Sequence, residues 1–130
     1  MRRMFVEKWL TLFRLLTDET RMRIMVALSA RPLCVCELAD LLDVSQPKVS
    51  KHLAKLRDLG YVEGQRHEKY ILYRLHFPGK SEEVLFQALM QHRQTSAVLD
   101  DLFHKAQALA PVWATRPPMD NAFDAAGKDR

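Results

Sequence analysis

Apolar residues recur every three or four positions through the first forty residues, which is the spacing of one face of an α-helix. The pattern predicts a first helix over residues 6–16, a second that begins after Asp18 and ends before Pro32, and a short third over 37–42. Asp18 is a good N-cap because its carboxylate accepts hydrogen bonds from free backbone N–H groups. We expect residues 33–36 to form a short connector.

The fourth predicted helix has the sharpest division between its two faces. Ser45 is a good N-cap, Pro47 suits the first turn, and Gly60 marks the end of the helix. On a helical wheel the large apolar side chains gather on one face, while the opposite face is small, polar and basic. A short helix, a tight turn and then this helix are typical of a helix-turn-helix, whose second helix enters the major groove of DNA.

Two strands are predicted next, over residues 61–64 and 70–75, with a polar loop over 65–69 between them. Because a hairpin at this place forms a wing, the expected fold class is mainly α (α+β): a winged helix-turn-helix with a two-stranded wing. After Pro78 and Gly79 the apolar stripe predicts one long helix, capped by Ser81 and ended by Pro111. Residues 1–110 are thus expected to form a winged-helix domain for DNA binding and dimerisation, and residues 111–130 a C-terminal tail.

Composition adds limits to this prediction. The 130 residues are 48% hydrophobic and 28% charged, which is ordinary for one globular domain and excludes a disordered chain. Glu7 and Lys8 interrupt the first apolar run, so it does not fit a signal peptide, and no apolar stretch is long enough to span a membrane. We therefore expect a cytoplasmic protein without membrane association, whose two cysteines stay reduced.

Positive charge is concentrated around the predicted helix-turn-helix and wing. Residues 44–80 hold eight Lys and Arg residues against three Asp and Glu residues, a net charge of +5, whereas the whole chain carries +4. A solvated face would explain the charge alone, but with the helix pattern it favours binding to double-stranded DNA. The residues expected to contact DNA are Ser45, Gln46, Lys48, Ser50, Lys51 and Lys55 on the helix, with Arg66 and Lys69 on the wing.

The first and last predicted helices carry more apolar surface than a small winged helix can bury alone. We expect them to form a two-fold interface, so that the two recognition helices of a homodimer meet the halves of a palindromic operator. The residues assigned to this dimerisation surface are Trp9, Leu10, Phe13, Leu85, Leu89, Leu99 and Leu102.

Three segments resemble the ArsR/SmtB family of winged-helix metalloregulatory repressors. Residues 12–24 (LFRLLTDETRMRI) are similar to the family's opening signature, although Glu19 stands where many members have proline. Residues 45–53 (SQPKVSKHL) resemble its recognition helix, and residues 33–38 (LCVCEL) resemble the thiol motif of its arsenic-sensing branch. The resemblance covers about residues 6–105. It implies a homodimeric repressor that binds its operator without an inducer and releases it when the inducer is bound.

Cys34 and Cys36 are the only cysteines of the chain. In an extended segment, residues two apart point to the same face, so both thiols could hold one ion. Cys36 stands where the N-cap of the 37–42 helix is expected, and a helix N-terminus favours the thiolate. A soft ion or an arsenical fits this pair best, with a thiol redox switch or two inert structural cysteines as the alternatives. Structural zinc needs four ligands, so no structural cofactor is expected.

The resemblance also implies which inducer the pair would take. Arsenic-sensing relatives commonly carry a third cysteine three residues after the second, where this chain has Ala39. The expected inducer is therefore As(III), Sb(III) or methylated As(III), and a monomethyl arsenical needs only two thiolates. His92 and His104 do not match the ligand spacing of the family's other metal site. No constellation of enzyme residues stands out, so an enzyme is not expected.

Overall fold

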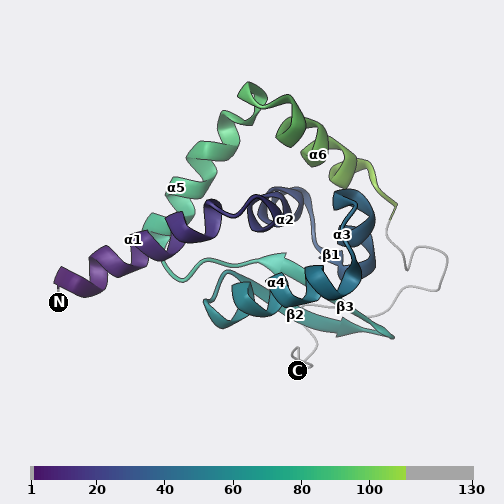
Figure 1. Ribbon diagram of the computed structural model, residues 1–130, viewed down its shortest axis with the longest axis horizontal. Helices are drawn as coiled ribbons and strands as arrows, with labels where there is room; N and C mark the ends of the chain where they lie inside the picture. Colours follow the sequence, from purple (N-terminus) through teal and green to yellow (C-terminus); the bar gives the residue numbers. More distant parts are fainter. Residues whose placement is uncertain (1, 111–130) are drawn as a thin grey trace.

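The computed structural model describes residues 2–110, with side chains from Val6 onward. Its elements are α1 (Arg2–Leu16), α2 (Glu19–Ala30), β1 (Leu33–Cys34), α3 (Val35–Leu42), α4 (Gln46–Asp58), β2 (Val62–His67), β3 (Tyr70–Leu75), α5 (Lys80–Gln91), the 3-10 helix η1 (Arg93–Thr95) and α6 (Ala97–Ala108). Figure 1 shows α2 at the centre, with α5 and α6 on one side of it and α4 and the strands on the other. This arrangement confirms the winged helix-turn-helix. The tail expected over residues 111–130 lies outside the described residues.

The helix-turn-helix consists of α3 and α4, and its caps follow the sequence prediction. Ser45 is the N-cap of α4, where its side chain accepts a hydrogen bond from the backbone N–H of Lys48 at 3.4 Å. Gly60 follows the C-cap with φ +86°, a conformation that L side chains rarely adopt. The apolar face of α4 is buried through Val49, Leu53 and Leu56. Its polar face is therefore left toward the outside of the molecule.

The wing is longer and tighter than the sequence pattern predicts. β2 and β3 pair in register from Val62 with Leu75 to His67 with Tyr70, so the five-residue loop expected over 65–69 is wrong. A turn of two residues replaces it, with Glu68 in the left-handed region at φ 58°. The pattern is misleading because Gln65 and His67 are polar and yet buried within β2. The expected connector is also partly strand, since β1 pairs with β3 in an antiparallel sheet of order β1-β3-β2.

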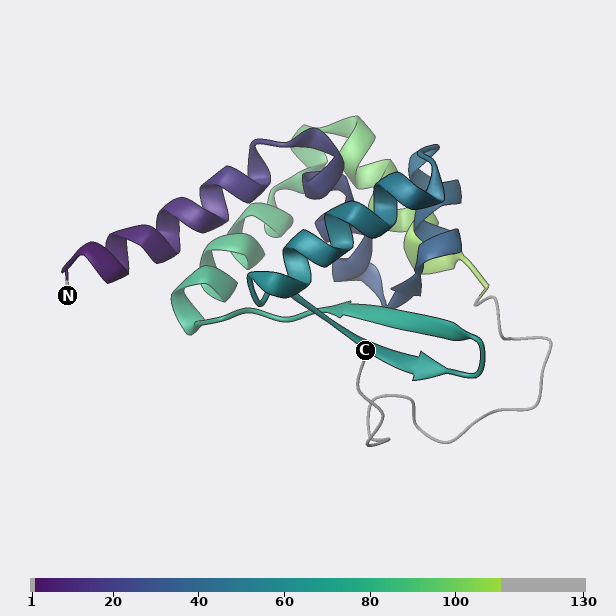
Figure 2. The same ribbon diagram turned by 60° about the horizontal axis from the view of Figure 1, so that its bottom comes forward.

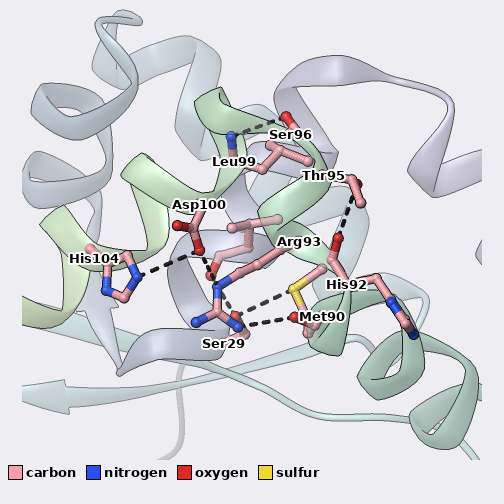
Figure 3. A network of polar contacts seen from close by, with 10 residues as sticks. Ser29, Met90, His92, Arg93, Thr95, Ser96, Leu99, Asp100 and His104 are labelled. Atoms are coloured by element: carbon pink, nitrogen blue, oxygen red, sulfur yellow. Dashed lines mark hydrogen bonds and ion pairs between the residues drawn. The ribbon is translucent and has the colours of Figure 1, made fainter.

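The long helix expected after Gly79 is two helices joined by η1. Ser96 caps α6 by accepting a hydrogen bond from the backbone N–H of Leu99 at 3.3 Å. We call η1 and the start of α6 the elbow between the two helices. Figure 3 shows Arg93 in this elbow, where its Nε lies 3.1 Å from Oδ1 of Asp100. The guanidinium also lies 3.6 Å from the centre of the Phe103 ring. The expected N-cap is wrong as well: Gly79 caps α5, and the Ser81 hydroxyl donates to Glu82. The elbow turns α6 back onto α2.

The dimerisation surface expected from the sequence is only partly on the outside of the chain. The side chains of Trp9 and Phe13 on α1 and Leu89 on α5 are 51%, 45% and 50% exposed, and Leu10 is also exposed. Leu85 and Leu99 are half-buried against the core. Leu102 is 4% exposed and belongs to the core of the single chain, so its assignment to the dimerisation surface is wrong. Within residues 2–110, no helix has the length and apolar character needed to cross a membrane.

Candidate thiol site and nucleic-acid interface

The thiol pair lies at the junction of β1 and α3. Cys34 ends the strand and is the N-cap of α3, with extended backbone at φ −96° and ψ 172°. Cys36 lies in the first helical turn, because α3 begins at Val35, two residues earlier than predicted. The expected N-cap role of Cys36 is therefore wrong. The convergence of the thiols is nevertheless observed, since the two Sγ atoms lie 3.1 Å apart.

Glu37 holds this junction in place, and the sequence interpretation overlooked it. Its Oε1 accepts a hydrogen bond from the backbone N–H of Cys34 at 3.0 Å, and its Oε2 lies 3.4 Å from the Arg31 guanidinium. Arg31 also donates to the backbone carbonyl of Leu109 after α6. The carboxylate is buried although it is charged, which the pairing with Arg31 compensates. A glutamate three residues after an N-cap is a known helix-start signal and points to this contact.

Cys34 is a protonated thiol in the ligand-free chain. Burial raises its pKa to about 12, and the hydrogen bond with Cys36 contributes in the same direction. The helix N-terminus was expected to favour a thiolate at Cys36 as the N-cap, whereas the N-cap is Cys34 and its thiol is protonated. The physical reason is that its side chain is 1% exposed, so that desolvation of the charged form outweighs the helix field. Cys36 is half-buried and lies nearer to solvent.

A groove of about 330 Å³ connects the thiols with the helix-turn-helix and the wing. The thiol segment contributes residues 34–36, α4 contributes Gln46 and Ser50, and the hairpin contributes residues 69–71 and Tyr73. A second groove of about 360 Å³ reaches Cys36 from its other side, between α3 and α6. Both grooves reach Cys36, the more accessible of the two thiols, and one of them is also lined by Gln46, Ser50 and Lys69, three residues expected to contact DNA.

The donor set at this junction consists of two sulfur atoms. Among the residues that the structure describes, no group of three or more His, Cys, Asp or Glu side chains could hold a metal ion. Ala39, where a third cysteine would stand by the resemblance, is a buried residue of α3. His104 on α6 lies 3.5 Å from Asp100, within the elbow of Figure 3, and His92 is exposed. The chemistry available at the junction is that of a dithiol.

The residues expected to contact DNA are all exposed, and they belong to one side of the molecule. Figure 2 shows this side, which α4 and the β2–β3 hairpin form together. Arg66 lies beside the turn of the wing and donates to the backbone carbonyl of Glu68 at 3.3 Å. Lys69 lies in the turn itself, with its Nζ 5.6 Å from the centre of the Tyr70 ring. The exposed residues of this candidate interface are Ser45, Gln46, Lys48, Ser50, Lys51, Lys55, Arg66 and Lys69.

Comparison with known proteins adds independent findings. The family model described as bacterial regulatory protein, arsR family, matches residues 18–64, which include the thiol pair and α4. The arsenical resistance operon repressor of Escherichia coli is 44% identical to this chain over 80 residues, 59% of this chain and 68% of that protein.

Solved structures with similar folds add to these findings. HlyU from Vibrio cholerae has a TM-score of 0.60 at 28% identity, covering 67% of this chain and 92% of that chain. The AntR antimony-specific transcriptional repressor has a TM-score of 0.55 at 27% identity, covering 68% of this chain and 83% of that chain.

Proposed function

Because the chain belongs to the ArsR family of bacterial regulatory proteins, we propose that it is a homodimeric repressor that a trivalent arsenical releases from its operator. Cys34 and Cys36 bind the inducer, and α4 with the wing binds palindromic double-stranded DNA. The observation that carries the proposal is the 3.1 Å separation of the two Sγ atoms at the start of α3. α3 packs directly against α4. A conformational change at the thiols, at the start of α3, can therefore be transmitted to the DNA-binding helix α4 through this helix–helix contact.

The surface of α4 and the wing supports the DNA-binding part of the proposal. Lys48, Lys51 and Lys55 are exposed on α4, while its apolar side chains are buried beneath them. Lysine side chains of this kind bind phosphates, and short polar side chains near the helix N-terminus can reach base edges in the major groove. Gln46 and Ser50 are the exposed polar residues in the corresponding part of α4.

The exposed apolar face of α1 and α5 supports the dimer. Trp9, Phe13 and Leu89 each leave about half of a large apolar side chain exposed, and exposed apolar patches mark interaction sites. A second copy of the chain is the occupant that fits a repressor of a two-fold operator, because an isologous interface pairs the same surface of both copies. The dimer then sets the distance between the two α4 helices.

The two thiols suit an arsenical by distance and by chemistry. Metal–thiolate bonds of about 2.3 Å place two sulfurs on one ion at separations of up to about 4.6 Å, so the observed 3.1 Å is compatible with chelation. Soft thiolate donors select soft ions. Trivalent arsenic or antimony with a hydroxide or other small third ligand, or a methylated arsenical, fits a site with two sulfurs. The antimony-specific repressor among the structural neighbours supports the inclusion of Sb(III).

Release follows from a shift of equilibrium between two conformations of the dimer. Two bonds to one arsenic atom constrain Cys34 at the N-cap and Cys36 in the first turn, which changes the start of α3. The inducer acts only through its higher affinity for the DNA-free conformation, and DNA must weaken inducer binding by the same factor. A coupling of about 1–3 kcal/mol corresponds to about 5–150-fold release for each site.

The proposal is tested by titrating the intact protein–operator complex with arsenite, antimonite and methylarsonous acid in the presence of a thiol-free reductant. We expect operator release at inducer concentrations stoichiometric with the dithiol, together with loss of two reactive thiols for each chain. Release by the oxidant diamide but by none of these three compounds would instead support a thiol redox switch. If neither arsenicals, antimonite nor diamide release the operator, the cysteines are structural.

A further inference from the structure

The groove that begins at the thiols is much larger than a bound ion requires. Its volume is about 330 Å³, roughly ten times the ~30 Å³ that one water molecule occupies in the liquid. Cys34 and Cys36 lie at its lining together with Tyr70, Ile71 and Tyr73 from β3. The polar residues of the same lining are Gln46 and Ser50 of α4 and Lys69 of the turn. The residues that β3 contributes to the lining, here called the β3 wall, are thus aromatic and aliphatic, and they share the groove with the two cysteines.

Trivalent arsenic needs a third ligand beyond the two thiols. Arsenic(III) forms three bonds, and the described part of the chain offers two thiols with no third donor grouped beside them. A compound that already carries one carbon–arsenic bond needs only the two sulfurs. Its carbon substituent then projects from the dithiol into the space next to it.

Building on the proposed function, we propose that this groove is a subsite for the carbon substituent of an organoarsenical and that it favours an aryl group over a methyl group. The reaction joins a dihydroxy organoarsenical to the two thiols. Two S–H bonds and two As–O bonds break, two As–S bonds form, two water molecules leave, and arsenic stays trivalent. No oxidant is needed, and the thiol protons leave with the water.

Tyr70 is the residue that should distinguish the two substituents. An aromatic ring in the groove buries apolar surface against the β3 wall, and a pair of aromatic rings gains about 0.5–1.5 kcal/mol beyond simple burial, or about two- to tenfold in affinity. A methyl group is too small to form such a pair. Tyr70 is half-buried at the end of the wing, outside the hydrophobic core, so its substitution does not remove a core side chain.

The test compares phenylarsonous acid with methylarsonous acid on the full chain. Each dissociation constant is measured in competition with dithiothreitol, so that the intrinsic affinity of each arsenical for a dithiol cancels. We expect the wild-type protein to favour the phenyl compound about two- to tenfold more than dithiothreitol does. Tyr70→Ala should lose this excess and retain wild-type affinity for the methyl compound, whereas Tyr70→Phe, the matched control, should keep the excess.

The outcomes separate this inference from the function on which it rests. If neither compound reacts with the thiol pair, the proposed function fails. If both bind and the wild-type preference equals that of dithiothreitol, the groove is not a subsite, although the dithiol still binds arsenicals. An excess that persists unchanged in Tyr70→Ala also contradicts the proposed subsite, because the β3 wall then contributes nothing to the preference.

Discussion

The buried carboxylate of Glu37 accepts a hydrogen bond from the backbone N–H of Cys34 at 3.0 Å. This contact ties the strand end that carries one thiol to the helix that carries the other. The ion pair of the same carboxylate with Arg31 extends the connection to the end of α2. Glu37 therefore positions the two thiols relative to each other.

Removal of this contact should loosen the thiol pair and destabilise the fold. For Glu37→Ala we expect the free energy of unfolding to fall by about 1–3 kcal/mol, because the Cys34 N–H and the Arg31 guanidinium both lose a buried partner. Urea denaturation measures the loss, and Asp40→Ala, which removes an exposed acid from the same helix, is the control. Equal stability of the two variants would show that the Glu37 contact contributes little.

The protonation of Cys34 predicts an unusual alkaline titration. Its pKa is about 12 in the folded chain, above the ordinary value of 9.0. The native state then holds this proton more tightly than the unfolded chain between about pH 9 and about pH 12. The stabilisation is fully present below this window and is lost as the pH rises through it.

Thiolate absorbance measures this titration directly. The difference spectrum between Cys36→Ser and the double serine variant isolates Cys34, and burial, the largest cause of the shift, remains in the single variant. We expect the thiolate signal to keep rising beyond pH 10 in the folded protein and to have its midpoint near pH 9 in urea. A folded-state midpoint below pH 9 would contradict a buried, protonated Cys34.

Lys51 on the exposed face of α4 tests the DNA interface. Lys51→Ala should weaken operator binding and lower the slope of log affinity against log salt by about one unit, the change expected for one lost phosphate contact. Lys105→Ala provides the matched control, since Lys105 on α6 pairs with Asp101 at 3.2 Å and lies outside the candidate interface. An unchanged slope for Lys51→Ala, or the same change for both variants, would contradict the docking of α4 on DNA.

Phe13 tests the dimerisation surface. Phe13→Glu places a charge on the exposed apolar face of α1, and burying that charge in an interface carries a desolvation cost. We expect the dimer dissociation constant in sedimentation velocity to rise at least about tenfold. Val98→Glu adds the same charge to an exposed position on α6 and should leave the dimer intact. A wild-type chain that sediments as a monomer at micromolar concentration, with or without DNA, rules out the dimer.

Helix ends and the buried face of α4 were predicted correctly from the sequence, because they depend on residues close together in the chain. Asp18, Ser45 and Gly60 occupy the cap positions that their residue types predict, because each satisfies backbone groups or a backbone angle on its own. The apolar face of α4 is buried as its spacing predicts.

The predicted secondary structure was wrong where contacts between distant parts of the chain determine it. β1 is two residues long and exists because it pairs with β3, a partner almost forty residues away. Polar Gln65 and His67 lie in a strand because the sheet continues through them. The break between α5 and α6 was missed because the apolar pattern continues across it. Ser96, a good N-cap residue, is the signal that could have revealed it.

The local structure that brings the two cysteines together was not predicted from the sequence. Convergence of Cys34 and Cys36 was expected from an extended segment, whereas it arises from an N-cap and the first turn of α3. Glu37 accepts a hydrogen bond from Cys34 at the early start of the helix, and the burial of Cys34 raises the pKa of its thiol. Burial of a single side chain depends on the whole fold and could not be derived from spacing.

The central claim is that the thiol pair is the sensor, and operator-binding anisotropy of Cys34→Ser and Cys36→Ser beside the wild-type protein tests it most directly. Each serine variant should bind the operator with wild-type affinity, because neither sulfur lies among the exposed residues of the candidate DNA interface. On titration with arsenite or methylarsonous acid, the wild-type protein should dissociate and both variants should stay bound. Dissociation of both variants at the inducer concentration that releases the wild-type protein would contradict the account.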